Sequence, residues 1–228
     1  MADPPIITTA AAGPDRVPQA ATLYASAFRT DPVITYMLSN LAPATRAAYL
    51  PTYFTSLLTA ATLNAALFSH TRDYSSCLVL LPPNRRVDNP WTLLPAGILR
   101  MLWRLGLRAC WRMLGEYGRA TDAVKAKGLR GQSRYYYVFF LATAESCRGQ
   151  GLSSALIRCA QERARAEGVP LWLEATTEYS WGLYASLGFE TVERVVLGEG
   201  VAAADGTREV GGPGVPVWGM VWWPEKAA

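Results

Sequence analysis

The segment from Tyr135 to Gly168 constrains the fold of this chain more than any other. Its first part, Tyr135 to Thr143, is an apolar run rich in aromatic residues and predicts a buried strand. Its last part, ALIRCAQERARAEG, has apolar residues at helical spacing. A glycine turn joins the two and opens directly onto the helix. Because the free N–H groups at a helix start carry partial positive charge, this unit predicts a binding site for an anion, phosphate above all.

The glycine turn reads Arg148-Gly149-Gln150-Gly151-Leu152-Ser153. Its small residues allow the backbone to approach a ligand closely, and the forked guanidinium of Arg148 suits a pyrophosphate. The turn therefore predicts a diphosphate cradle.

At these residues the chain resembles the GNAT superfamily of N-acetyltransferases, whose signature is Arg or Gln, two residues, Gly, one residue, then Gly or Ala. Arg148 and Gly151 match this signature, and Ser153 replaces its last small residue. The similarity continues through GVPLWLEATTEYSWGLYASLGFETVER, with the "LY-x-x-LGF" ending. Within the superfamily the chain looks closest to the puromycin N-acetyltransferase-like small-molecule enzymes. The ordered set of motifs, rather than the turn alone, makes the resemblance specific.

The resemblance implies an α/β (α+β) fold of the GNAT type. Its central sheet is mixed but mostly antiparallel, splays between two central strands, is flanked by helices, and is preceded by extra helices. It also implies that acetyl-CoA is the co-substrate, with its pantetheine arm between the splayed strands. The residues expected to hold it are Leu141, Ala142, Thr143, Arg148, Gly149, Gln150, Gly151, Leu152, Ser153, Ser154 and Ser180.

Two catalytic residues follow from the same resemblance. Tyr184 stands in the general-acid position, four residues before Gly188, and would protonate the departing thiolate. Glu174 matches the carboxylate of the "LE" segment and is the expected general base, directly or through water. It could instead orient a turn or bind the acceptor's cation, and Glu145 and Glu116 are lesser candidates.

The rest of the chain predicts one domain over residues 1–228. Pro4 to Ala10 predicts a strand. Asp15 is expected to be the N-cap of the helix that follows, and Asp31-Pro32 predicts the start of a second helix. A long helix over Pro43 to Leu67 precedes a hairpin near Asp73, in which the single histidine, His70, is expected to be structural. Phe189 to Leu197 and Val215 to Trp222 predict a closing hairpin, with residues 201–214 as a mobile loop.

Trp91 to Leu114 predicts a surface helix with arginines at four-residue steps, namely Arg100, Arg104, Arg108 and Arg112. The arginines are expected to form a solvated stripe, and the apolar residues to take the other face. Contact with a membrane surface or an acidic partner is the sharper alternative. Gly115 to Ser133 is expected to be a polar connector.

Composition excludes several functions. The net charge of +4 fits binding of a polyanionic small molecule and is too small for a nucleic-acid surface. The four cysteines form no C-x-x-C pair, so we expect no metal site and reduced thiols. The N-terminus lacks the pattern of a signal peptide, and no integral membrane segment is predicted, so a cytoplasmic location is expected.

These features predict an acetyl-CoA-dependent N-acetyltransferase of a small-molecule primary amine, by direct transfer, with a possible role in detoxification or resistance. Peptide or protein N-acetylation and a non-catalytic acetyl-CoA-binding module are the alternatives. The aromatic residues expected to line the acceptor pocket favour a flat or apolar amine; they are Tyr36, Trp91, Tyr135, Tyr137 and Trp181.

Overall fold

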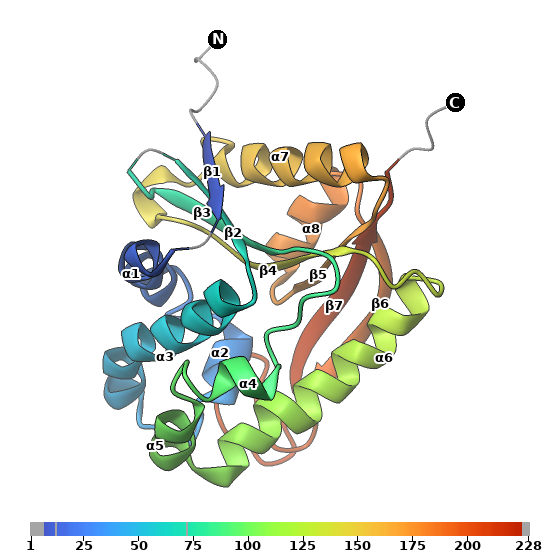
Figure 1. Ribbon diagram of the computed structural model, residues 1–228. Coiled ribbons are helices and arrows are strands. Elements are labelled where there is room, and N and C mark those ends of the chain that lie inside the picture. The colour runs from blue at the N-terminus through green and yellow to red at the C-terminus, as the bar shows by residue number, and fades with distance from the viewer. Residues whose placement is uncertain (1–6, 12, 72, 225–228) are drawn as a thin grey trace.

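The computed structural model describes residues 7–11, 13–71 and 73–224, and its strands form one seven-stranded sheet (Figure 1). The strand order is β1-β2-β3-β4-β5-β7-β6, and only the β4–β5 pair is parallel. This confirms the predicted mixed, mostly antiparallel sheet. The strands are β1 (Ile7–Ala11), β2 (Leu67–Thr71), β3 (Ser76–Leu81), β4 (Tyr136–Thr143), β5 (Leu171–Ala175), β6 (Glu190–Leu197) and β7 (Val215–Trp222).

Helices cover both faces of this sheet. The alternation of β3 divides the core: Cys77 and Val79 pack with the N-terminal helices, whereas Leu78 packs with α7. The helical elements are η1 (Pro14–Arg16), α1 (Val17–Ala27), α2 (Pro32–Met37), α3 (Pro43–Leu63), α4 (Pro90–Leu93), α5 (Ile98–Cys110), the π-helix η2 (Trp111–Tyr117), α6 (Gly118–Gly128), η3 (Glu145–Cys147), α7 (Leu152–Glu167) and α8 (Glu178–Ser186).

The sheet splays between β4 and β5. These strands pair only at Tyr136–Leu171 and Tyr137–Trp172. Beyond that point β4 stays paired with β3 as far as Thr143, and β5 stays paired with β7 as far as Ala175. The inner edges of both strands are therefore released from each other, as predicted.

The N-terminal part agrees with the sequence analysis except at one cap and at the end of α3, which stops at Leu63 and not at the predicted Leu67, where β2 begins. Asp31 caps α2 as predicted, accepting a hydrogen bond from the Ile34 N–H at 2.9 Å. Asp15, predicted to cap the first helix, instead lies within the short 3-10 turn η1, and α1 begins after Arg16 without a side-chain cap. Of the strand predicted over Pro4 to Ala10, the first three residues lie outside the described residues.

The β2–β3 hairpin is confirmed, and His70 within it has structural contacts. Its Nε2 lies 3.1 Å from Arg16 Nη1, and its ring stacks on Tyr74 with 3.9 Å between centroids. These contacts join β2 to the start of α1.

The segment after Pro83 differs most from its prediction. The single helix predicted over Trp91 to Leu114 is interrupted twice. The left-handed Gly97 separates α4 from α5, and the non-helical Gly106 kinks α5, which then continues into the π-helix η2. The predicted polar connector from Gly115 to Ser133 is wrong, since α6 continues the helical path to Gly128. Helix α6 packs tightly on the sheet: a Cβ at Gly219 would lie 2.6 Å from Val124 and 2.9 Å from Trp172. Tertiary packing thus orders a stretch that looked polar in sequence.

Residues 201–214 form a turn-rich loop closed on itself by backbone hydrogen bonds, including Ala203 N–H to Thr207 O and Gly214 N–H to Ala202 O. The loop lies against α2, where a Cβ at Gly206 would clash with Pro32 O and lie 2.7 Å from Tyr36 N. The mobility of this loop stays a prediction. Its contact with α2 can be tested by substitution at Gly206.

Gly206→Ala is expected to lower the free energy of unfolding by about 2–5 kcal/mol, since it combines a left-handed backbone with a steric clash. Gly211→Ala is the matched control: its φ of 76° is similar to the 84° of Gly206, but its added Cβ would meet nothing within 4 Å. The control should lose only about 1–2 kcal/mol. Equal losses in urea unfolding would show that the loop does not press on α2.

Candidate active site

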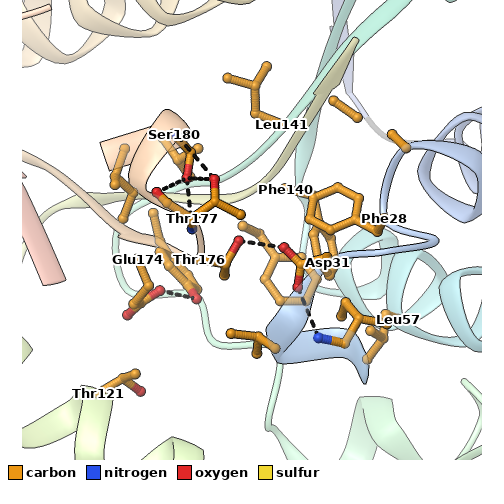
Figure 2. A pocket seen from close by; sticks show the side chains of 18 of the residues that line it. Phe28, Asp31, Leu57, Thr121, Phe140, Leu141, Glu174, Thr176, Thr177 and Ser180 are labelled. Atoms are coloured by element: carbon orange, nitrogen blue, oxygen red, sulfur yellow. Dashed lines mark hydrogen bonds between the residues drawn. The ribbon is translucent and has the colours of Figure 1, made fainter. Parts of the chain in front are cut away.

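One large cavity of about 1090 Å³ begins at the splayed strands and extends between the helices. Its walls come from β4, the N-terminal turn of α7, the loop from β5 into α8, helices α1 to α3, and α6. Figure 2 shows side chains from these separate elements meeting around it. A volume of this size can hold a small-molecule ligand together with part of a larger one.

The turn into α7 forms an open cradle at one part of this cavity. Gly149 and Gly151 have φ values of 77° and 76°, and a Cβ added at either would meet nothing within 4 Å. No side chain caps α7. Within the described part of the chain, the N–H groups of Gly151, Leu152 and Ser153 have no hydrogen-bond acceptor. These groups and the nearby Arg148 are available to bind an anionic group such as a diphosphate.

Hydroxyl groups fix this cradle to the central strand. Ser153 Oγ lies 2.6 Å from Thr143 Oγ1, which in turn lies 2.7 Å from Ser76 Oγ. Ser76 also donates to Ala142 O at 3.0 Å. The start of α7 and the released end of β4 are thereby held in a fixed relation.

Tyr184 reaches the cavity from α8. Its ring is buried against Phe189, with 5.8 Å between centroids, and within the residues described its hydroxyl has no hydrogen-bond partner. Burial raises the pKa of this phenol well above its ordinary value. The group is therefore a neutral O–H donor throughout the physiological range.

Asp31 presents a buried carboxyl group to the same cavity (Figure 2). One oxygen caps α2, and the other accepts a hydrogen bond from Thr176 Oγ1 at 2.6 Å. Burial raises the pKa of Asp31 to about 6, and the two hydrogen bonds lower it only in part. Such a carboxyl group can exchange a proton near neutral pH.

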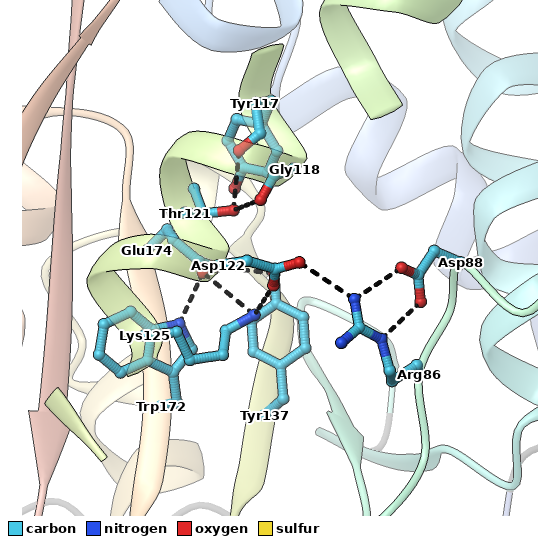
Figure 3. Close-up of polar contacts among 10 residues, drawn as sticks. All are labelled: Arg86, Asp88, Tyr117, Gly118, Thr121, Asp122, Lys125, Tyr137, Trp172 and Glu174. Atoms are coloured by element: carbon cyan, nitrogen blue, oxygen red, sulfur yellow. Dashed lines mark hydrogen bonds and ion pairs between the residues drawn. The ribbon is translucent and has the colours of Figure 1, made fainter. Parts of the chain in front are cut away.

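Glu174 belongs to a more extensive polar network (Figure 3). Its oxygens accept hydrogen bonds from Tyr137 at 2.7 Å and Trp172 at 2.6 Å, and Lys125 Nζ lies 3.9 Å away. The side chain is only 3 % exposed. With hydrogen-bond donors on both oxygens and the Lys125 ammonium nearby, this carboxylate is well suited to hold the wall of the cavity in place.

The network continues toward the solvent through Asp122. Lys125 lies 3.3 Å from this carboxylate, and Arg86 bridges it to Asp88 at 3.1 and 2.7 Å. These residues line the cavity as well. The polar wall thus carries charges of both signs, opposite the apolar wall of α1 to α3.

The part of the chain that contains this site resembles a known protein family. The model of the acetyltransferase (GNAT) family matches residues 109–189, which contain the cradle, the splay, Glu174 and Tyr184. This part of the chain belongs to the GNAT family of acetyltransferases. An uncharacterised N-acetyltransferase of Schizosaccharomyces pombe is 22 % identical over 180 residues, covering 78 % of this chain and 72 % of the relative.

Two solved structures share the GNAT fold over nearly their whole length. An agmatine N-acetyltransferase mutant without ligand has a TM-score of 0.63 and 14 % identity, with 95 % of this chain and 99 % of the other covered. A mosquito arylalkylamine N-acetyltransferase-like protein has a TM-score of 0.61 and 15 % identity, with 96 % and 100 % covered. The fold of this GNAT enzyme therefore extends beyond the matched family region.

Most residues predicted to hold acetyl-CoA in this GNAT enzyme lie together along the cavity. Gln150 is the exception and does not line it; those that do are Leu141, Ala142, Thr143, Arg148, Gly149, Gly151, Leu152, Ser153, Ser154 and Ser180. Ser180 is already engaged, since it forms a reciprocal capping box with Thr177 at the start of α8. Its predicted contact with pantetheine would have to compete with this cap.

The predicted acceptor residues divide into two groups. Tyr135 and Tyr137 line the cavity. Tyr36 does not, because its hydroxyl donates to Glu116 at 2.7 Å outside it. Trp91 is 84 % exposed on the outer surface, and Trp181 stacks on Trp218. Glu116 is likewise structural, accepting also from the Gly198 N–H at 2.7 Å.

Asp31 is the candidate residue to which the sequence analysis gave only a capping role. The Asp-Pro dipeptide identified the cap, but its burial beside Thr176 depends on a contact between residues 145 positions apart. The aromatic residues Phe28, Tyr53 and Tyr117 also line the cavity and were not predicted to do so. Only the packing of α1, α3 and η2 brings them together.

Neither a bilayer-spanning helix nor a metal-binding cluster occurs among the described residues. No helix there is long and apolar enough to cross a bilayer. In the same ranges, no group of three or more His, Cys, Asp or Glu side chains is placed to hold a metal ion.

Proposed function

We propose that this enzyme transfers an acetyl group from acetyl-CoA directly to the primary amine of a small, largely apolar molecule, with residues 1–228 acting as one domain. The observation that carries the proposal is the cavity itself, which joins an open anion cradle, two splayed strands and the buried carboxyl groups of Asp31 and Glu174 in one space. Enclosure by the N-terminal helices and α6 favours a small acceptor over a peptide.

The donor would bind in two parts. The N–H groups at the start of α7, with Arg148, hold the diphosphate, and the edge of β4 from Leu141 to Thr143 hydrogen-bonds the pantetheine arm like an added strand. A backbone N–H of this edge would polarise the thioester carbonyl. Because β5 does not pair with β4 beyond Tyr137, the backbone groups on this edge from Leu141 to Thr143 are free to bind the pantetheine arm.

The acceptor would enter between α1, α2 and α6. Its body packs against an aromatic and aliphatic surface that includes Phe28, Tyr53, Tyr117 and Tyr137. This lining favours an arylalkylamine-like acceptor over a polyamine, although charges on the polar wall could hold a second polar group. A possible role in detoxification would follow from the identity of this amine.

Proton transfer would use two groups. We propose Asp31 as the base that removes the proton from the bound ammonium, because its buried carboxyl group has a pKa of about 6. The neutral amine attacks the thioester carbon, the carbon–sulfur bond breaks, and the Tyr184 hydroxyl gives its proton to the departing thiolate. The second proton of the attacking nitrogen passes through water to the Tyr184 phenolate, which leaves the amide neutral. Asp31 releases the first proton to solvent before the next cycle. Glu174, the base expected from the sequence, would instead position Tyr137 and Lys125.

The proposal is tested with an amine panel. The enzyme is incubated with acetyl-CoA and arylalkylamines, agmatine, polyamines or peptides, and both coenzyme release and product mass are followed. We expect the highest kcat/KM for arylalkylamines. Preference for a peptide N-terminus or lysine would overturn the small-molecule assignment.

Asp31→Asn is expected to lower kcat/KM by roughly 10²–10³-fold, and to remove the loss of activity that the wild type shows below about pH 6. Glu174→Gln should lower activity less and keep the acidic limb of the pH profile. A profile unchanged by Asp31→Asn, with the limb lost in Glu174→Gln, would assign the base to Glu174.

The same substitution has a stability signature. The pKa of Asp31 is raised in the folded state, so the native protein binds more protons than the unfolded chain between about pH 4 and pH 6. Stability from this group is present below about pH 4 and is lost as the pH rises through about 6. Asp31→Asn should remove this dependence while keeping the cap, and should be more stable than the wild type at pH 7, by up to about 3 kcal/mol. Urea unfolding between pH 4 and 7 measures it.

A further inference from the structure

The outer surface of α4, α5 and η2 exposes large apolar side chains. The exposed fraction reaches 87 % at Trp103, 84 % at Trp91 and 78 % at Leu107. Four of these residues, Leu99, Trp103, Leu107 and Trp111, follow one another at four-residue steps, and all four are exposed although the non-helical Gly106 kinks the segment between them. We call this set the apolar ridge: Trp91, Leu94, Leu99, Trp103, Leu107, Trp111 and Leu114.

The ridge corrects the predicted orientation of this segment. The apolar residues were expected to take the face away from the arginines. Trp103 and Leu107 are instead exposed next to the arginines, and Met101, Leu105 and Ala109 occupy the buried side of α5. Arg112 was expected in the solvated stripe, but it is half-buried and donates to Tyr36 O and Ser39 Oγ at 2.8 Å. Water therefore meets Trp and Leu side chains that a soluble helix normally covers.

Cations flank the ridge without compensating acids. Arg100, Arg104 and Arg108 each follow a ridge residue by one position, are exposed, and form no salt bridge within the ranges the structure describes. The sequence from Asn89 to Gly115 contains four arginines and no Asp, Glu or Lys. The charged side chains of this segment are thus all positive.

We propose that the apolar ridge and its three arginines dock this enzyme on an anionic lipid bilayer. Tryptophan and leucine side chains partition into the headgroup and acyl boundary, and arginines pair with anionic headgroups around them. A second copy of the chain fits less well, because a symmetric contact would set three arginines against three. Helix α5, with 13 residues, lies on the bilayer rather than crossing it.

The position of the ridge connects it to the cavity. Leu93, Ile98 and Met113 line the cavity from the inner side of the same segment. Figure 1 shows α4 and α5 on the side of the molecule away from β1 and α7. Docking would therefore bring the wall of the acceptor region next to the lipid surface, where apolar amines concentrate. This consequence rests on the proposed function.

The test uses the full chain with vesicles of phosphatidylcholine alone or with added phosphatidylglycerol, and measures the bound fraction by co-sedimentation. We expect binding only to the anionic vesicles, with loss at about 0.5 M salt, where screening acts over only a few ångströms. The variant Arg100→Gln/Arg104→Gln/Arg108→Gln should bind about 100-fold more weakly. Trp103→Ala/Leu107→Ala should weaken binding and reduce the blue shift of tryptophan fluorescence.

A matched variant removes the same charge elsewhere. Arg158→Gln/Arg163→Gln/Arg165→Gln alters three exposed arginines of α7 and should bind vesicles nearly as well as the wild type. Equal loss in both triple variants would show that only net charge matters and would overturn the docking surface. Equal binding to neutral vesicles, preferential binding to polyglutamate, or dimerisation lost in Trp103→Ala/Leu107→Ala would overturn it too. Coenzyme release with soluble amines should be unchanged in these variants, which separates this test from that of the proposed function.

Discussion

Replacement of Tyr184 by phenylalanine is expected to lower kcat by roughly 10²–10⁴-fold while leaving acetyl-CoA affinity within a factor of a few. The phenol is buried, faces the cavity, and has no hydrogen-bond partner among the residues described, so its removal leaves the fold with few lost contacts. Without the Tyr184 proton, coenzyme A must leave as the thiolate or take a proton from water. Stopped-flow and steady-state coenzyme release measure the change.

The control for this prediction is Tyr136→Phe. Tyr136 is also buried, but its hydroxyl donates to Glu167 and it does not line the cavity. This variant should lose about 1 kcal/mol of stability with little change in kcat. If Tyr184→Phe behaved like this control, the leaving thiolate would need another proton source.

Gly151→Asp is expected to weaken acetyl-CoA binding by about 100-fold or more. The added side chain meets open space in the protein, so the loss would come from charge and bulk placed where the diphosphate binds. The positive φ of 76° adds strain of about 1–2 kcal/mol to the fold. Titration calorimetry with acetyl-CoA measures the affinity, and thermal unfolding the strain.

Gly168→Asp provides the matched control at the other end of the same helix. Gly168 is exposed, has a φ of 64°, and would also meet nothing within 4 Å on gaining a Cβ. The control carries the same charge and comparable strain but lies away from the cavity, so its acetyl-CoA affinity should equal that of the wild type. Similar losses of affinity in the two variants would mean that strain, and not the cradle, explains the effect.

Local sequence signals predicted the glycine turn before α7, and the family resemblance predicted the splay between β4 and β5. Gly149 and Gly151 predict a turn with left-handed backbone, which glycine adopts at little cost. The helical pattern that follows predicts the direction of the free N–H groups at the helix start. The resemblance of this unit to a known family then supplied Tyr184 and the strands around it. Such short-range features can be predicted from the sequence because they depend on few contacts with distant residues.

The acceptor side could not be predicted in the same way. Burial raises the pKa of Asp31, and its hydrogen bond comes from Thr176, far along the chain. Neither the burial nor this contact can be recognised from the residues next to Asp31 in the sequence. Helix α6 looked like a polar connector because its packing depends on Gly128 and Gly219, whose role is to be small. The outward turn of Trp103 and Leu107 contradicts the usual rule that apolar residues face inward.

Amide hydrogen exchange with and without acetyl-CoA is the most direct test of the account. Acetyl-CoA should slow exchange at the N–H groups of residues 151–153 and along β4 from Leu141 to Thr143, and leave the amide of Gly168 unchanged. If saturating acetyl-CoA left the exchange of these amides as it is in the free enzyme, the proposed cradle and pantetheine site would be wrong.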